Sequence, residues 1–133
     1  MNNDVLLITE KDFLRIKHTL SFQRSPEFEN LEIELDRAKV IPDNEVPTDL
    51  VTMNSKVKFL NINAEKEMVV TIVYPSDTNF AEGRISVLAS LGSALIGLRV
   101  GQQINWQFPD GQTKTLKILE ILYQPEANEH WHL

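Results

Sequence analysis

The segment Ile85–Phe108 constrains the fold of this chain more than any other part of the sequence. It opens with a short apolar run, continues with small residues and returns to apolar ones. We therefore expect a short strand and then a short helix over Ser90–Leu98, with Ser90 as the N-cap. Polarity then alternates over Ile104–Phe108, as in a strand that buries one face. Pro109–Gln112 has the residues of a tight turn and predicts a β-hairpin, so the segment indicates an α+β fold.

Other segments supply the remaining strands of the predicted sheet. Lys56–Phe59 alternates in polarity, and Met68–Tyr74 is rich in β-branched and aromatic residues. Thr113–Tyr123 is expected to form a last, long strand. Thr48–Ser55 is interpreted as a connector or edge segment, and Gln124–Leu133 as a frayed tail.

The first part of the chain has helical periodicity. Thr9 can cap a helix whose first turn is acidic. An apolar stripe follows at Phe13, Ile16 and Leu20. Ser25 and Pro26 are a second start signal, as N-cap and first helical residue, for a helix that continues to about residue 40. Two helices of about 12–15 residues joined by a short loop predict an antiparallel two-helix hairpin, a short coiled coil with arms of about 20 Å.

Pro42–Pro47 interrupts the helical pattern and is the predicted boundary between two parts of the chain. We expect a helical hairpin over residues 1–46 and a β domain with one short helix over residues 47–133. The second helix is strongly acidic on its outer face, with carboxylates at Glu27, Glu29, Glu32, Glu34 and Asp36.

The composition excludes several classes of function. The 133 residues include no cysteine, which excludes disulfide bonds, thiolate chemistry and cysteine-ligated zinc. A net charge of -6 argues against dominant contacts to nucleic-acid phosphates and favours a basic protein surface as the partner. No apolar run approaches the roughly 20 residues that span a bilayer, and no basic segment precedes the first apolar run. We therefore expect a cytoplasmic protein without a signal peptide or membrane contact.

Few side chains suggest a catalytic or metal-binding role. His130 and His132 lie two residues apart, but two ligands on a terminal tail do not make a structural metal site. His18 is expected on a solvated helix face. Glu27 and Glu29, near the tip of the hairpin, could hold Mg²⁺, but residues two apart point about 200° away from each other on a regular helix. A solvated acidic helix start is the favoured interpretation, and no enzyme signature remains.

Several sequence blocks occur in an order that is specific to one family. They are Glu34–Ala38, Val51–Phe59, Val73–Pro75, Ile85–Val87, Ala94–Gly101 and Tyr123–Ala127. With these blocks, nearly the whole chain resembles the family of regulators of nucleoside diphosphate kinase, within the superfamily of Gre transcript-cleavage factors. The resemblance implies the helical hairpin and an FKBP-like antiparallel β domain.

The resemblance also implies a function. Gre factors dock their β domain at the rim of the RNA polymerase secondary channel and insert the hairpin, whose acidic tip helps to hold the metal that drives RNA cleavage. Family members with a short hairpin occupy the channel entrance without stimulating cleavage, and arms of about 20 Å follow that shorter pattern. The resemblance therefore implies a non-catalytic polymerase binder that competes with cleavage factors and affects nucleoside diphosphate kinase levels indirectly.

The polymerase-binding positions implied by the resemblance lie at the start of the predicted short helix. They are Ser86, Ala89, Ser90 and Leu91, with Asp77 and Arg84 in the neighbouring loop as weaker candidates. No cofactor, metal or sequence-specific nucleic-acid contact is expected, and the protein is expected to be a monomer. Two alternatives remain: a prolyl isomerase, because FKBP-like folds include such enzymes, and Gre-like cleavage with Glu27 and Glu29 as metal ligands. Trp106 and Phe108 are expected to fill the core rather than an open isomerase pocket.

Overall fold

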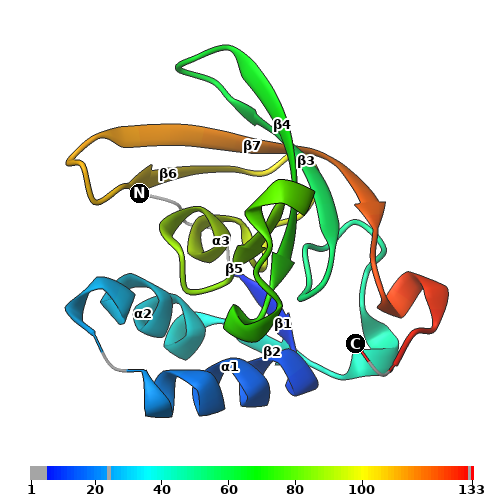
Figure 1. Cartoon of the computed structure of the whole chain (residues 1–133). Helices are drawn as coiled ribbons and strands as arrows, with labels where there is room; N and C mark the ends of the chain where they lie inside the picture. Colours follow the sequence, from blue (N-terminus) through cyan, green and yellow to red (C-terminus); the bar gives the residue numbers. More distant parts are fainter. Residues whose placement is uncertain (1–5, 24, 132) are drawn as a thin grey trace.

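The computed structural model describes residues 6–23, 25–131 and 133. Five strands form one curled sheet in the order β5-β4-β3-β7-β6 (Figure 1). They are β3 (Lys56–Asn61), β4 (Lys66–Val73), β5 (Arg84–Ser86), β6 (Gln103–Gln107) and β7 (Thr113–Tyr123). The predicted strands are confirmed: β7 has the predicted bounds, and β3 and β4 differ from theirs by at most two residues at either end. The predicted turn at Pro109–Gln112 joins β6 to β7, where Phe108 N donates to Gln112 O at 2.9 Å.

The sheet is not purely antiparallel as expected. Strand β5 pairs with β4 in parallel, with Thr71 opposite Arg84 and Val73 opposite Ser86. The loop between β4 and β5 contains two short 3-10 turns, η3 (Pro75–Asp77) and η4 (Phe80–Glu82), and it carries the chain back so that β5 can run parallel to β4. A parallel pair needs such a crossover, whereas a tight hairpin turn can only join antiparallel strands.

The helical hairpin is present, but it is shorter than predicted. Helix α1 (Glu10–Phe22) begins at Thr9, whose Oγ1 accepts from Asp12 N at 3.0 Å, so the predicted cap is confirmed. The 3-10 turn η1 (Pro26–Phe28) precedes α2 (Glu29–Arg37), and Lys17 Nζ lies 2.7 Å from Asp36 Oδ1 between the two helices. The second helix has 9 residues and a length of about 13 Å.

The second helix stops before residue 40 because the chain enters a strand. β2 (Lys39–Ile41) pairs in parallel with β1 (Leu7–Thr9), which directly precedes α1. Val40 and Ile41 are β-branched, and Ile41 precedes Pro42, so both features disfavour a further helical turn. This small second sheet closes the base of the hairpin.

The helix at the centre of the chain also differs from its prediction. α3 spans Ser90–Leu95, and its N-cap is Ala89, which makes no side-chain cap hydrogen bond. The prediction that Ser90 caps this helix is therefore wrong. The helix also ends before the expected Leu98, because Gly97 has a φ of 83°, in the left-handed region that ends a helix.

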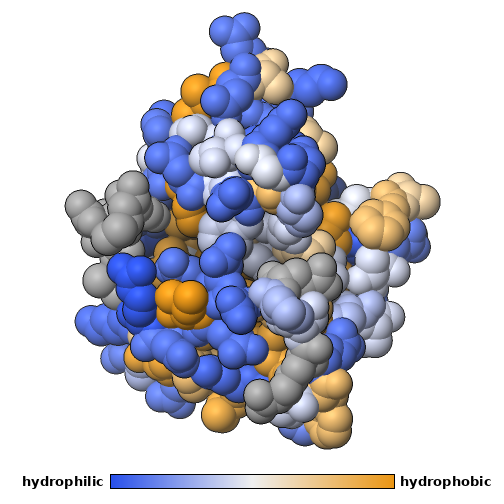
Figure 2. Space-filling view, turned by 90° about the vertical axis from the view of Figure 1, so that its left-hand side faces the viewer, coloured by the Kyte–Doolittle hydropathy of each residue, from blue (hydrophilic) through white to orange (hydrophobic). Residues whose placement is uncertain are grey.

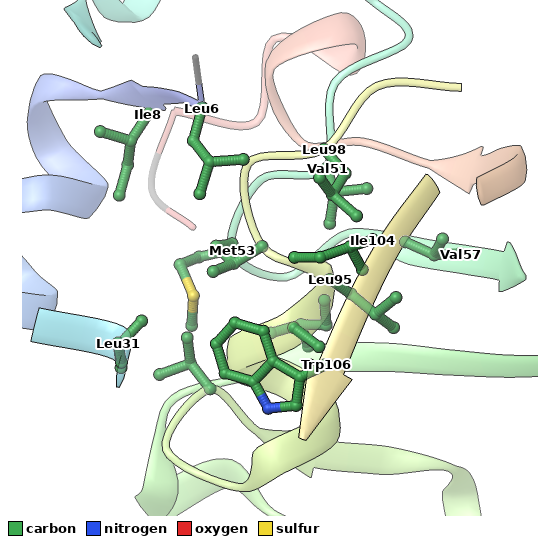
Figure 3. Close-up of a cluster of buried hydrophobic side chains, with 14 of the residues drawn as sticks. Leu6, Ile8, Leu31, Val51, Met53, Val57, Leu95, Leu98, Ile104 and Trp106 are labelled. Carbon is green, nitrogen blue, oxygen red and sulfur yellow. The ribbon is translucent and has the colours of Figure 1, made fainter. Parts of the chain in front are cut away.

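A single hydrophobic core joins the hairpin to the sheet. Figure 3 shows Leu31 of α2 and Leu6 beside β1 directed toward the cluster that contains Met53 and Trp106. Trp106 is buried as predicted, and Phe108 is half-buried against the same cluster. The apolar stripes of both helices therefore pack on the β domain, which fixes where the hairpin lies.

Most of Thr48–Ser55, the predicted connector or edge segment, is buried, although Thr48 at its start is exposed. Val51 N donates to Leu98 O at 2.8 Å, and Gly97 N donates to Val51 O at 3.0 Å. Leu50, Thr52, Met53 and Ser55 are also buried. The sequence showed a connector but not its burial, because the elements that cover it come from both ends of the chain.

The expected frayed tail is wrong for its first residues. Gln124 is buried, and its Nε2 donates to Pro47 O and Leu50 O, both at 2.8 Å. Glu126 is also buried, and its Oε1 accepts from Thr52 Oγ1 at 2.7 Å. Lys11 Nζ of α1 donates to Trp131 O at 2.7 Å, so this segment bridges the β domain and the hairpin. His132 lies outside the described residues.

Replacing Thr52 by valine is expected to lower the free energy of unfolding by about 2 kcal/mol. The variant keeps the shape of the side chain but removes the hydroxyl that donates to the buried Glu126 carboxylate. Thermal and urea unfolding would measure the change. Thr113→Val, at an exposed position of β7, is the matched control and is expected to change stability by less than about 0.5 kcal/mol.

Candidate functional site

The surface between the hairpin and the β domain is hollowed along the start of α3. One hollow of about 270 Å³ lies there. Its β-domain wall is formed by Pro75, Ser86, Leu88, Ala89 and Ser90, and its hairpin wall by Gln23 and Phe28. Ala89 is exposed on this wall, and Pro75, Ser86 and Ser90 are half-buried, so the wall presents mostly small side chains to a partner.

A second hollow of about 460 Å³ continues from the first. It lies between the later turns of α1 and the loop after β4, which come close to each other in Figure 1. Its lining residues are Arg15, His18, Thr19, Phe22, Gln23, Tyr74, Pro75, Ser76 and Asp77. Because Gln23 and Pro75 line both hollows, the two form one depression, which we call the junction trough.

Short-range hydrogen bonds fix the β-domain wall of the junction trough. Ser86 Oγ accepts from Leu88 N at 3.0 Å, and Ser93 Oγ donates to Val87 O at 2.7 Å. The backbone of α3 crosses this turn closely at Gly92, where a Cβ atom would lie 2.2 Å from Ser86 O. The wall is therefore a rigid turn held from beneath by α3.

The structure brings together four of the six residues expected to contact polymerase. Ser86, Ala89, Ser90 and Asp77 all line the junction trough. Leu91 is half-buried and packs on the core. Arg84 lies apart from the trough, beside a different hollow that it lines with Asn54, Lys56 and Thr71.

The hairpin wall includes residues that were not among the predicted polymerase contacts. Arg15, His18 and Phe22 follow one another at helical spacing along α1 and all line the trough. Phe22 is 76% exposed, which is unusual for a large aromatic side chain. In the sequence, these three residues form a second stripe along α1, separate from the apolar stripe that faces the core, and this spacing could have indicated the wall. His18 is exposed as predicted.

A buried carboxylate holds α1 against the β domain beneath the trough. Asp12 is 1% exposed, and its Oδ2 accepts from Met53 N at 3.0 Å. Its Oδ1 has no hydrogen-bond partner among the described residues. Burial raises the pKa of Asp12 from 3.8 to about 6, and the nearby negative charge of Glu126 acts in the same direction.

The floor of the trough contains a tyrosine next to this carboxylate. Burial raises the pKa of the Tyr74 hydroxyl, and the charge of Asp12 raises it further, while Arg15 opposes both effects. Tyr74 therefore stays a neutral hydroxyl across the physiological range. Tyr74 therefore lies between the buried Asp12 carboxylate and the surface of the trough.

The hairpin tip differs from a regular helix start. Glu27 lies in the 3-10 turn η1 and Glu29 begins α2, so the turn is irregular here; the Glu27 side chain lies outside the described part of the chain. Glu29 is exposed. Figure 2 shows that hydrophilic side chains cover most of the face that includes α2. Within the described ranges, no three acidic or histidine side chains are grouped to hold a metal ion, and no helix is long and apolar enough to cross a membrane.

Comparison with known proteins gives consistent results at the levels of sequence and fold. Residues 46–123 match the family model of the transcription elongation factor GreA/GreB C-terminal domain. The chain is 41% identical over 130 residues to the regulator of nucleoside diphosphate kinase of Escherichia coli (strain K12), over 96% of each chain. It is 34% identical over 94 residues to transcription elongation factor GreA of Helicobacter hepaticus, over 71% of this chain and 57% of that protein. The solved structure of transcription elongation factor GreA/GreB from Nitrosomonas europaea is similar with a TM-score of 0.74 and 37% identity, over 91% of this chain and 100% of that one.

Proposed function

Because the chain belongs to the GreA/GreB family of transcription elongation factors, we propose that it binds RNA polymerase through the junction trough, at the rim of the secondary channel. The observation that carries this proposal is the grouping of Ser86, Ala89, Ser90 and Asp77 on one rigid wall. The family resemblance had implied these positions from sequence blocks alone. Their convergence on one concave surface supports a docking role.

The charge of the molecule supports a protein partner. The chain has a net charge of -6, and the second helix exposes Glu29 and Asp36. Such a surface is attracted to basic protein and repelled by nucleic-acid phosphates. We therefore propose that the contact is made to polymerase itself, by a monomer, without direct recognition of DNA or RNA sequence.

The dimensions of the hairpin favour a role without catalysis. Helix α1 has 13 residues and α2 has 9, which give lengths of about 20 Å and about 13 Å. Both helices also pack their apolar stripes on the β domain, which leaves little of the hairpin to project. A protein of this shape can occupy a channel entrance without carrying a carboxylate to the polymerase active site. It would then compete with cleavage-stimulating Gre factors and alter nucleoside diphosphate kinase levels only indirectly.

A competition experiment tests this proposal. A stalled, backtracked elongation complex is mixed with a GreA factor, and this protein is titrated into the reaction. We expect inhibition of RNA cleavage as the protein approaches saturation, and no cleavage with the protein alone. Cleavage by the protein alone would contradict the non-catalytic role, and the absence of both inhibition and direct polymerase binding would contradict the docking role.

Ala89→Arg is expected to weaken polymerase binding by about tenfold or more, because the long side chain would occupy the trough and block the partner. Ala64→Arg, in the exposed turn between β3 and β4, introduces the same side chain away from the trough and is the matched control. Binding would be measured by fluorescence anisotropy or surface plasmon resonance. Equal affinities of the two variants would show that this wall does not contact polymerase.

A further inference from the structure

The trough has two walls, and the family resemblance accounts for only one of them. The β-domain wall includes Ser86, Ala89 and Asp77. The facing hairpin wall is made by Gln23 and Phe28 in the first hollow, and chiefly by α1 in the second hollow, which Asp77 lines. Gln23 and Pro75 line both hollows, so the walls face each other across one continuous depression. A partner segment that follows the β-domain wall from Ala89 to Asp77 must therefore pass along α1.

Phe22 is the most prominent apolar group on the α1 wall. It is 76% exposed, although large aromatic side chains usually bury most of their surface. Its ring packs edge-on against His18, with ring centroids 4.9 Å apart, and this contact restrains the ring beside the trough. An aromatic group that is held in place but left in solvent is the kind of residue that contributes strongly to binding when a partner covers it.

The charges of the two walls differ in sign. Arg15 lies on the α1 wall beside Tyr74, and Asp77 lies on the β-domain wall. Among the described residues, neither Arg15 nor Asp77 takes part in a salt bridge, although Arg15 interacts with the Tyr74 hydroxyl. Within this part of the chain, neither side chain is therefore paired with an opposite charge. An exposed arginine is notable in a chain with 19 acidic and 13 basic residues.

We propose that helix α1 forms the second half of the polymerase-docking site, with Phe22 as its hydrophobic anchor. The polymerase segment in the trough is apolar where it covers Phe22 and carries an acidic side chain where it meets Arg15. This inference rests on the proposed function, because it names the chemistry of the same partner at the same site. It also assigns the short hairpin a role in gripping the partner.

Phe22→Ala tests the anchor, and Phe80→Ala is its matched control. Phe80 is 81% exposed in η4, and it does not line either hollow of the trough. We expect Phe22→Ala to weaken polymerase binding by about tenfold and Phe80→Ala by less than about twofold. Thermal unfolding of both variants is expected to match the wild type, because each ring is largely in solvent.

Arg15→Ala tests whether the positive charge of Arg15 contacts an acidic side chain of polymerase. We expect weaker polymerase binding at low ionic strength and a smaller difference from the wild type at high ionic strength, since salt screens the contact. His18→Ala removes the ring that packs on Phe22 and is expected to weaken binding less than Phe22→Ala does.

The outcomes separate this inference from the function on which it rests. If wild-type protein does not bind polymerase, the proposed function fails and the inference fails with it. If wild-type protein binds and Ala89→Arg does not, but Phe22→Ala binds as tightly as Phe80→Ala, the docking role holds and the role of α1 is wrong. An effect of Arg15→Ala that does not depend on salt would show that the partner segment is not acidic at that position.

Discussion

Gly92→Ala is expected to destabilise the protein by about 3 kcal/mol or more, although alanine is the better helix former. Gly92 is buried in α3, and a Cβ atom there would lie 2.2 Å from Ser86 O and 3.0 Å from Val87 Cα. Both contacts are to backbone atoms, which cannot rotate away as a flexible side chain can. The helix would have to move off the turn that forms the wall of the junction trough.

Urea unfolding of Gly92→Ala against wild type measures this effect, and polymerase binding reports on the trough. Gly111→Ala is the matched control, because Gly111 has no atoms within 4 Å of the added Cβ position. Its φ of 85° makes alanine strained there, so we expect a loss of about 1 kcal/mol. A Gly92→Ala protein as stable as the wild type would show that α3 can shift away from Ser86 without loss.

Asp12→Asn is expected to stabilise the protein near neutral pH and to have little effect in acid. The carboxylate of Asp12 is buried, so its pKa is raised from 3.8 to about 6 in the folded state. Between these values the folded protein binds a proton that the unfolded chain has released. Wild-type stability therefore falls as pH rises through this window, and the full difference corresponds to about 3 kcal/mol.

Asparagine keeps an oxygen that can accept from Met53 N, but it has no charge to bury. The fall in stability with rising pH is therefore expected to disappear in the variant. The hydrogen bond that holds α1 against the β domain is expected to be retained. The measurement is the free energy of unfolding from about pH 4 to about pH 7 for both proteins. Asp77→Asn makes the same substitution at an exposed site and is the matched control. Parallel pH profiles of wild type and Asp12→Asn would contradict the prediction.

Several features that depend on a few neighbouring residues were predicted correctly from sequence. The bounds of β7, the cap at Thr9 and the turn at Pro109–Gln112 all follow from short patterns and are confirmed. The cap is a hydrogen bond between residues three apart, so the sequence around Thr9 contains all that it requires. Ordered sequence blocks also indicated the family, because each block carries information that no single residue does.

The failed predictions for the connector and the tail depended on residues that are distant in sequence, whereas the failed cap at Ser90 is a local feature. Asp12 meets Met53 across 41 positions, and Thr52 meets Glu126 across 74, so neither the buried connector nor the ordered tail has a local signature. The polar composition after Tyr123 is typical of a frayed end, and only tertiary contacts give Gln124 its buried partners.

The sequence was sufficient to predict most strands of the main sheet, the start of α1 and the family, and the family resemblance implied positions on one wall of the candidate site. Local hydrogen bonds and hydrophobic periodicity act over a few residues, and these forces are read directly from the chain. Three features could be seen only in the folded molecule: α1 lies opposite Asp77 across the trough, Arg84 lies elsewhere, and Phe22 stays in solvent. The hairpin and the sheet share one hydrophobic core. The packing of apolar faces that are distant in sequence therefore decides which surface residues lie next to each other.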